Sequence, residues 1–558
     1  MPAGHEPDDY FRSDHSSMAK SPRTGVRNIS PMHREATETS RLLPPTDSGT
    51  VEHLEAAHSS RISWQAITYI LMAVICLVGT GDQLLESPTA RIMEAVICYR
   101  HYEKEDPSKI LVGRKAVGPG AIGGVAEMWC KVGPVQEQLA SLRGYQQFLE
   151  GFPSLLLAVP FGWAADRYGR KPLLMLGVLS LVLRNSWIQL VVWFWQAFDI
   201  RMTWLSSLYG LLAGGNPVMS SIFFVVLSDV APQKLRAGVF LRVGAAELVT
   251  NLIVPPVAAW MMDFNPWIPS LMGTVFMIAS FFVCRFCPET LNSRHPHGSP
   301  SQSHPPSPTR ESAPPPPPPD MSESQHSISA NFPERLFYNI KGASAFIMQD
   351  WRVPALILPF VEHILIGTSK PLLMQYVSQR YGLTFSNSTL LLTILNGVRV
   401  LLLFVILPYA STLALQSFGL SVQEKDLYLA RASQFFVFMG WTLVGLSPNI
   451  PLVAVSMAIA SLGAGAMLLV RSFLTSLVPA HHIARVYSII SIVDTLGVMF
   501  GSPFLAALFN RGMELGGRWV GLPFYFLGVM SAAFAVLLFA TRLRKDEVEA
   551  QETDEEDE

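Results

Sequence analysis

Ionisable side chains interrupt several long apolar segments of this sequence, and they are its first candidates for chemistry. If these segments cross a bilayer, a charged group at the centre costs about 2.5–3.5 kcal/mol on insertion scales and normally faces a cavity or a partner. We therefore expect these side chains to bind a solute or a proton. In the first half they are Asp82, Glu86, Glu150, Arg184, Glu247 and the neighbouring amide Asn251, and in the second half Glu362, Lys370, Arg399 and Asp494.

Two of these acids, Glu247 and Asp494, occupy equivalent positions in an internal repeat. A shift of 247 residues places segment 227–259 over segment 474–506 and also aligns Pro256 with Pro503. Each acid lies near the middle of its apolar segment, where a carboxylate that binds and releases a proton would couple transport to a proton gradient. A structural ion pair with Arg184 or Arg399 is an equally good interpretation.

Three of the cationic candidates also have two interpretations. Arg184, Lys370 and Arg399 suit an anionic group of a solute, since guanidinium binds carboxylate and phosphate in a bidentate manner. The same three side chains would also neutralise the acids on neighbouring segments. The sequence leaves both open.

The elements that position these residues follow from composition. Of 558 residues, 50% are hydrophobic and 15% are charged, whereas soluble domains usually carry about 25% charged residues. The apolar residues gather in twelve segments of roughly 20 residues, the length that crosses about 30 Å of hydrocarbon as a helix. Only helices or closed barrels satisfy their backbone groups in lipid, and these segments are too long and continuous for barrel strands. We predict an all-α polytopic membrane protein.

The twelve segments divide into two sets of six, and short loops give their orientation. Lys and Arg gather in the short loops on one side, which places both chain termini in the cytosol and loop 86–140 outside. The expected parts are a disordered cytosolic tail at 1–62, a six-helix bundle at 63–286, a Pro/Ser-rich cytosolic linker at 287–352, a second six-helix bundle at 353–541 and an acidic cytosolic tail at 542–558.

Cysteines and a sequon suggest two modifications on the outer side. Cys98 and Cys130 would form a disulfide there or remain free thiols, and Asn387-Ser388-Thr389 is a glycosylation sequon. The five cysteines show no Cys/His spacing for a metal, so we expect neither a metal nor a cofactor. Without a nucleophile–base set or a phosphate-binding loop, we expect neither an enzyme nor an ATP-driven pump, and we expect a monomer with no nucleic-acid partner.

A motif between the second and third segments carries a family resemblance. Residues 162–172 read Gly-Trp-Ala-Ala-Asp-Arg-Tyr-Gly-Arg-Lys-Pro, which is similar to the signature of the major facilitator superfamily. Segment 228–236 resembles the loop between helices four and five of that family, and 287–290 resembles its Pro-Glu-Thr ending after helix six. The resemblance covers residues 63–541, and the motif's defining positions are Gly162, Asp166, Arg167, Gly169, Arg170 and Lys171, which we call the gating motif.

The resemblance implies two six-helix bundles with the substrate site between them, and a gating motif that latches the cytosolic side in one conformation. Physically, Gly162 would let neighbouring backbones approach closely, and Gly169 would permit a tight turn. A plain topology loop rich in positive charge is the alternative interpretation of the gating motif.

The expected function is secondary active transport of a small organic solute, driven by protons, through alternating access between the bundles. Alternatives are an efflux pump for drugs or secondary metabolites and a non-transporting sensor with the same fold. The closest overall resemblance within the family is to fungal members with a long first outer loop. Residues 38–43 fit an acidic dileucine sorting signal, so the vacuolar membrane and the plasma membrane are both expected locations.

Overall fold

The computed structural model describes residues 64–232, 235–290, 351–478 and 480–541. Within these ranges the chain is helical, without β-strands. The expected N-terminal tail with its dileucine signal, nearly all of the linker, and the acidic C-terminal tail lie outside the described residues.

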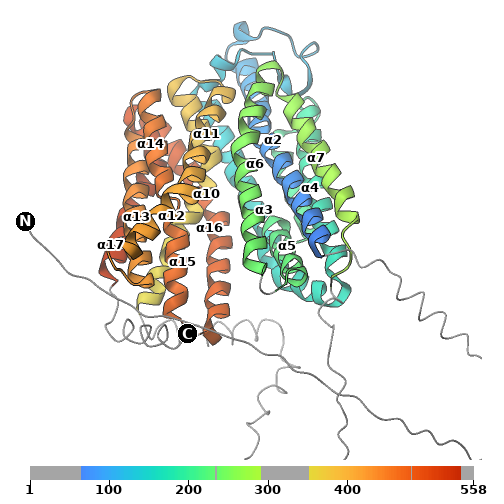
Figure 1. The fold of residues 1–558 in the computed structure, drawn as a ribbon. Helices are drawn as coiled ribbons and strands as arrows, with labels where there is room; N and C mark the ends of the chain where they lie inside the picture. The colour runs from blue at the N-terminus through green and yellow to red at the C-terminus, as the bar shows by residue number, and fades with distance from the viewer. Residues whose placement is uncertain (1–63, 233–234, 291–350, 479, 542–558) are drawn as a thin grey trace, which may run out of the picture. The chain divides into compact units, whose positions relative to one another are not determined.

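The first bundle contains six membrane segments, of which the first two are joined by a long loop (Figure 1). Its segments are α2 (Trp64–Glu105), α3 (Gly133–Tyr168), α4 (Arg170–Trp193), the 3₁₀ helix η5 (Ile200–Leu212) continued by α5 (Gly215–Val230), α6 (Arg236–Phe264) and α7 (Trp267–Arg285).

The second bundle repeats this arrangement. Its segments are α10 (Arg352–Tyr381), α11 (Phe385–Leu401) continued through the π-helical η9 (Leu402–Ile406) into α12 (Leu407–Gln416), α13 (Val422–Leu446), α14 (Ile450–Leu462) followed by α15 (Ala466–Leu477), α16 (Ala480–Leu515), and the short η10 (Gly517–Gly521) leading into α17 (Leu522–Ala540).

The expected fold of twelve spanning segments in two bundles is confirmed. Eleven of the described segments are long and apolar enough to cross a membrane by length and composition. The twelfth is α3, whose polar residues Arg143, Gln146 and Glu150 lower its hydropathy. Those polar side chains face cavities between the helices, as described below, so lipid does not have to solvate them.

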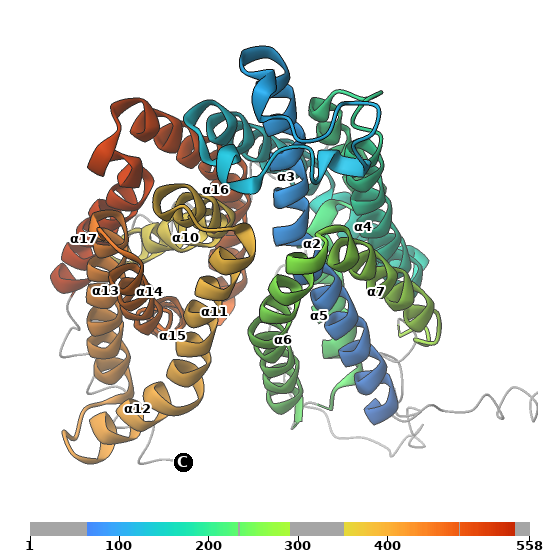
Figure 2. The ribbon, with the colours of Figure 1, turned by 90° about the horizontal axis from the view of Figure 1, so that it is seen from above.

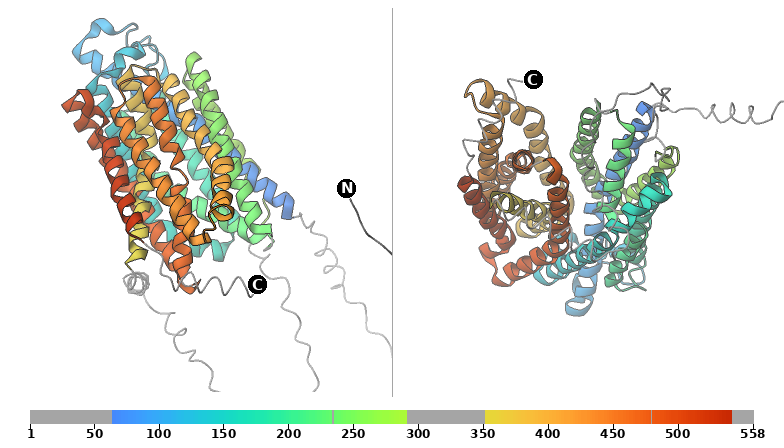
Figure 3. Two further views of the ribbon diagram at one scale, coloured as in Figure 1. Left: turned by 60° about the vertical axis from the view of Figure 1, so that its left-hand side comes forward. Right: turned by 90° about the horizontal axis from the view of Figure 1, so that it is seen from below.

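Two helix pairs hold the bundles against each other, α3 with α16 and α6 with α11 (Figures 2 and 3). Small residues permit the close approach: a Cβ placed on Gly144 of α3 would lie 3.1 Å from the Cβ of Ala506 on α16. Small residues at such crossings are typical of membrane helix packing, where van der Waals contact replaces the hydrophobic effect.

The fourth segment of each bundle is interrupted at a corresponding place. Ala213 and Gly214 separate η5 from α5, whose first residue is Gly215, and both glycines have positive φ. Residues 463–465 separate α14 from α15. The 247-residue shift of the repeat moves Gly214 onto Ser461, two residues before the second break. The repeat seen in α6 and α16 therefore extends to the preceding segment of each half.

The predicted outer loop 86–140 is wrong at both ends. α2 continues to Glu105 and α3 already begins at Gly133, which leaves a loop of residues 106–132 with the short 3₁₀ turns η2 (Pro107–Lys109), η3 (Pro119–Ala121) and η4 (Glu127–Lys131). The helix continues through charged positions because those charges are paired, as in the 3.2 Å ion pair between Arg91 and Glu94.

Candidate functional site: charged cavities between the two bundles

Three adjoining cavities lie at the middle of the helices, between the two bundles. Two of them, of about 200 and 470 Å³, share Asp82, Glu150 and Arg184 in their walls. The third, of about 190 Å³, shares Glu86 and Pro371 with the first. The cavities therefore form one connected region to which both bundles contribute.

The first two cavities form what we call the acidic site. Its ionisable residues are Asp82 and Glu86 on α2, Arg143 and Glu150 on α3, Arg184 on α4 and Asp494 on α16. They reach one region because α2, α3 and α4 pack within the first bundle while α16 crosses α3 from the second. Four carboxyl groups thus face two guanidinium groups.

The pairing within the acidic site leaves negative charge in excess. Arg184 Nε lies 3.4 Å from Glu150 Oε1, and Gln146 Nε2 donates to the same oxygen at 3.1 Å. Arg143 is close enough to Glu86 for an electrostatic interaction. Asp494 Oδ1 is buried and has no hydrogen-bond partner among the described residues. Chemically, this arrangement can take up a proton, because protonation would remove excess charge from a poorly solvated place.

The third cavity forms what we call the basic pocket. Its cationic or titratable side chains are His363 and Lys370 on α10, Arg399 on α11 and, at the boundary with the first cavity, Glu86 on α2. Asn396 on α11 donates from Nδ2 to the backbone oxygen of Asn251 on α6 at 2.8 Å, so the predicted amide Asn251 lies on the opposite wall. The basic pocket therefore lies where α6 of one bundle meets α11 of the other.

The two repeat-related acids face different parts of this region. Asp494 lies in the acidic site, on the side of the first bundle. Glu247 lies one turn from Asn251 on α6; its side chain is exposed, and its charge acts on Lys370 and Arg399 across the interface. Each acid therefore faces the bundle to which it does not belong.

Three of the predicted residues lie elsewhere than expected. Because the outer loop was predicted to begin at residue 86, Asp82 and Glu86 belonged to the outer end of the first helix. α2 continues for 19 residues past Glu86, so both lie mid-helix. Glu362 is only 2% exposed inside the second bundle. It accepts hydrogen bonds from Gln434 Nε2 at 2.7 Å and from the Ser531 hydroxyl, so it joins α10, α13 and α17 and does not line the three cavities.

Sequence reasoning missed Arg143 and undervalued His363. The second helix was expected to begin at residue 141, so Arg143 was expected in its first turn. α3 begins at Gly133 instead, which places Arg143 within the span. A charged residue between apolar stretches was the available signal. A lone helical histidine gives no such signal, because packed histidines are common.

The gating motif forms the junction between α3 and α4, and a distant carboxylate caps it. α3 ends at Tyr168, and Gly169 turns the chain with a φ of +98°. The carboxylate of Glu289 accepts the backbone N–H of Arg170 at 2.9 Å and that of Lys171 at 3.2 Å. A negative charge at a helix N-terminus satisfies free N–H groups and is favourable to the helix dipole.

The other motif segments converge on the same junction. Arg170, which is 1% exposed, forms an ion pair with Asp229 at the end of α5. The guanidinium of Arg167 lies 5.1 Å from the centre of the Trp163 ring. The three segments that carry the family resemblance thus meet at one end of the first bundle. Among the described residues, no atom outside the helix's own backbone comes within 4 Å of a Cβ placed on Gly162, so the close approach expected there is not seen in this conformation.

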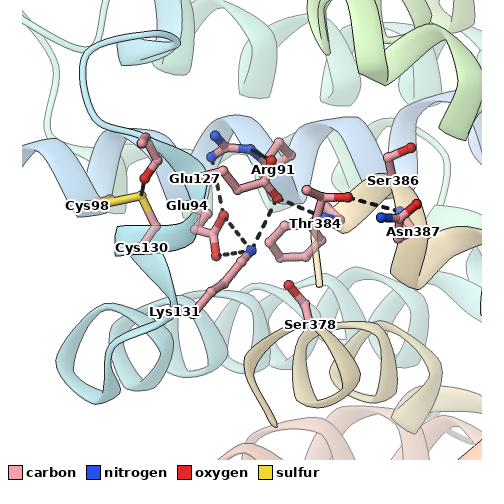
Figure 4. Close-up of polar contacts among 12 residues, drawn as sticks. Arg91, Glu94, Cys98, Glu127, Cys130, Lys131, Ser378, Thr384, Ser386 and Asn387 are labelled. Atoms are coloured by element: carbon pink, nitrogen blue, oxygen red, sulfur yellow. Dashed lines mark hydrogen bonds and ion pairs between the residues drawn. A yellow bond between two sulfur atoms is a disulfide. The ribbon is translucent and has the colours of Figure 1, made fainter. Parts of the chain in front are cut away.

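At the opposite end, which the loop charges predict to face outside and which we call the outer end, η4 of loop 106–132 contacts both bundles (Figure 4). The structure contains the expected disulfide between Cys98 and Cys130, which ties η4 to α2. In η4, Glu127 Oε1 accepts the backbone N–H of Phe385 at 2.8 Å, and Lys131 Nζ lies 4.3 Å from the centre of the Phe385 ring. The outer loop is therefore anchored on α2 and contacts the first residue of α11.

Buried charges stabilise this outer contact. Burial alone would raise the pKa of Glu127, but the charges of Arg91 and Lys131 outweigh burial and the pKa is lowered. Arg91 Nε lies 2.9 Å from Glu127 Oε2, and Lys131 Nζ lies 3.2 Å from Oε1. Because the ionised form is favoured, this stabilisation is present above the ordinary glutamate pKa and is lost as the pH falls through the lowered value.

Further cross-bundle hydrogen bonds lie on the outer side. Ser386 Oγ donates to the oxygen of Ala259 at 2.9 Å, and Gln375 Nε2 donates to the oxygen of Gln136 at 2.6 Å. Asn387 of the sequon is exposed in the first turn of α11, whereas the hydroxyl-bearing Thr389 is 2% exposed. Glycosylation of Asn387 stays a prediction. Within the described ranges, no group of three His, Cys, Asp or Glu side chains is placed to hold a metal ion.

Known proteins resemble this chain over most of its length. The MFS-type transporter aprT of Aspergillus flavus is 28% identical over 91% of this chain and 94% of its own. The MFS efflux pump atnC of Emericella nidulans is 27% identical over 87% of this chain and 90% of its own. A crystal structure of a D-xylose–proton symporter matches 85% of this chain and 97% of its own with a TM-score of 0.54 at 12% identity, which is a likeness of fold.

The sequence profile of the Major Facilitator Superfamily matches residues 144–501, more than half of the chain. The matched range begins in α3 and ends in α16, so it includes the gating motif and most of the charged cavities. The family consists of transporters, in agreement with the expectation that the protein is not an enzyme. This chain is a multi-pass membrane transporter that belongs to the Major Facilitator Superfamily.

Proposed function

We propose that this transporter exports a small organic solute in exchange for protons, by alternating access, as a monomer in the plasma membrane or the vacuolar membrane. The observation that carries the proposal is the acidic site, in which four carboxyl groups and two guanidinium groups from both bundles meet midway through the protein. Ionisable groups in such a place usually mark an ion or solute path.

The excess of carboxylates supports proton coupling. Arg184 acts on Glu150 and Asp82, and Arg143 acts on Glu86. Arg471, outside the cavity walls, acts on Asp494. Four carboxylates thus face three cations, and one negative charge remains in excess. Proton binding would neutralise this excess. Because Asp494 belongs to α16 and the other acids to the first bundle, the bound proton would change the attraction between the bundles, and this is how a proton gradient would drive their movement.

The distribution of cross-bundle contacts supports alternating access. Contacts such as Gln375 with Gln136 and Phe385 with Glu127 close the outer side, while the cavities lie further in. Export requires these contacts to separate and the opposite side to close. The gating motif would contribute at that opposite side, since its charged residues lie at the α3–α4 junction.

The direction of transport rests on similar proteins. The relative atnC is named an efflux pump, and it aligns with most of this chain. Export of a small organic compound is therefore favoured over uptake.

The test is transport by purified protein in sealed liposomes, with solute movement followed by mass spectrometry across a library of organic acids, amines and neutral metabolites. A pH gradient is imposed or omitted, and wild type is compared with Asp494→Asn and Glu150→Gln. The matched control is Glu103→Gln, which removes an exposed carboxylate that pairs with Arg114 at 3.4 Å on the outer surface.

We expect at least one solute to move against its gradient only when the pH gradient is present, and we expect Asp494→Asn to abolish this coupling while Glu103→Gln retains it. Gradient-driven movement that survives both acidic-site substitutions would remove the acidic site from the coupling role. If folded protein moves no solute under any condition, the transport proposal fails.

A further inference from the structure

We infer that the basic pocket is the solute subsite and that it takes an organic anion, a carboxylate attached to an apolar or aromatic body; this inference rests on the proposed transport function. In this assignment the solute binds in the basic pocket, and the proton binds in the acidic site. Charge, apolar lining and access each support it independently.

The charge of the basic pocket is the first support. Lys370 and Arg399 line the cavity, and no described carboxylate lies within ion-pair distance of either side chain. Arg399 Nε is buried without a hydrogen-bond partner. A buried guanidinium N–H group without an acceptor is costly. A bound carboxylate would supply the missing acceptor, in bidentate form.

The protein's own acids do not fully neutralise these cations. Glu86 borders the pocket, but Arg143, which lines the first cavity, is the cation that acts on it most strongly. Glu86 also acts on Lys370, and Glu247 acts on both Lys370 and Arg399, so two carboxylates face three cations. One positive charge remains for a ligand, which fits a singly charged anion better than a neutral or cationic solute.

The apolar lining is the second support. Trp441, Met374, Leu392, Leu395 and Val437 belong to the apolar part of the wall. Trp441 is held in place by a stacked contact with Phe524, with ring centres 5.9 Å apart. Ligand pockets typically combine such an apolar lining with a few polar groups that fix orientation. The body of the solute would contact this lining while its carboxylate reaches Arg399 and Lys370.

Access is the third support. The Lys370 side chain lies deep between the bundles yet is open to the cavity. The pocket includes Ser461, Gly463 and Ala464 at the break between α14 and α15. A break in a spanning helix exposes backbone groups that a ligand can contact, and such breaks often lie beside transporter binding sites. The pocket therefore has room for a ligand, whereas the side chains of a purely structural charge cluster would pack together without a cavity.

The probe is 2-naphthoate, an aromatic carboxylate, with 2-naphthamide as its neutral analogue of nearly the same shape. Equilibrium binding is measured calorimetrically on the full-length protein in lipid nanodiscs, without any gradient. We expect naphthoate to bind at least tenfold more tightly than naphthamide. We expect Arg399→Gln and Lys370→Gln each to weaken naphthoate binding at least tenfold while leaving naphthamide binding unchanged within twofold.

Two controls separate a binding role from a folding role. Arg380→Gln removes another cation of α10, beside the Tyr376 ring on the outer side, and should leave the preference for naphthoate intact. Arg399→Lys keeps the charge and should recover part of the lost affinity. Thermal denaturation of each variant verifies that the protein is folded.

Equal binding of naphthoate and naphthamide, no binding of naphthoate by folded protein, or an undiminished preference in both Arg399→Gln and Lys370→Gln would overturn the inference. Failure of the proposed function has a different signature: naphthoate would bind with the expected dependence on Arg399 and Lys370, but no solute would cross the liposome membrane. Binding and transport are therefore tested separately.

Discussion

At the scale of single residues, the two glycines of the gating motif have opposite environments and should respond differently to the same change. In Gly169→Ala, the alanine would have to keep a φ of +98°, which residues with a side chain rarely adopt. Its Cβ would also lie 2.5 Å from Glu289 Oε2. Strain of this kind costs about 1–3 kcal/mol, and the clash would also displace the cap of α4. We expect a lower melting temperature in detergent and reduced transport.

Gly162→Ala is the matched control, because no described atom of a neighbouring element lies within 4 Å of its added Cβ. Alanine also favours helix over glycine by about 1 kcal/mol, so we expect a melting temperature equal to or above that of wild type. Normal stability with lost transport in Gly162→Ala would mean that Gly162 is approached closely in another conformation. A Gly169→Ala variant as stable as wild type would contradict the role of the Glu289 cap.

Residue patterns identified most of the candidate site but not its pairings. A charge within an apolar segment is costly and therefore conspicuous, and this criterion found Asp82, Glu150, Arg184 and Asp494. It also selected Glu362, because a buried structural hydrogen bond and a cavity-facing carboxylate look alike in sequence. Glu289 caps α4, although more than a hundred residues separate the two in the sequence. This contact depends on how α4 and α7 pack, which the local sequence does not specify.

At the scale of elements, the disulfide should decide how firmly η4 closes the outer side. Cys98–Cys130 joins η4 to α2, and η4 in turn contacts Phe385 of α11 through Glu127. A disulfide typically contributes about 2–4 kcal/mol to stability. We expect Cys98→Ser, or mild reduction of wild type, to lower the melting temperature in detergent and to increase labelling of the outer loop by a membrane-impermeant lysine reagent.

Cys76→Ser is the control, since Cys76 is a free thiol on the same helix and should leave both measurements unchanged. Reduction should have no further effect on Cys98→Ser. If reduction leaves the melting temperature and the labelling of wild type unaltered, the outer contact does not depend on the disulfide and rests on the Glu127 ion pairs alone.

Helix number and type could be predicted from the sequence, whereas the ends of α2 and α3 could not. Hydropathy ends a span at the first charged cluster, but Arg91, Glu94 and Lys131 pair with one another and allow the helix to continue. The interruption at Gly214 and Gly215 was also not predicted, because two glycines in an apolar segment resemble ordinary membrane packing residues.

At the scale of the whole molecule, the two-bundle architecture could be predicted because it follows from counting spans and from the internal repeat. The sequence could not predict which side of the protein is closed. Both conformations of an alternating-access transporter use the same helices with the same local preferences, and they differ by a small free energy spread over the contacts between bundles. The sequence gives no signal that Gln375 meets Gln136 or that Phe385 meets Glu127.

A covalent lock between α3 and α16 on the outer side should therefore stop transport without preventing binding. Asn510 Nδ2 of α16 donates to Ser141 Oγ of α3 at 2.8 Å, so the doubly substituted protein Ser141→Cys/Asn510→Cys places two thiols within reach of a short bismethanethiosulfonate reagent. We expect cross-linking to abolish movement of any solute that the liposome screen identifies, to leave 2-naphthoate binding within twofold of wild type, and to be reversed by reduction. Each single substitution, treated identically, should keep transporting. Transport that persists in the cross-linked protein would show that the outer side need not open, and alternating access between these two bundles would have to be abandoned.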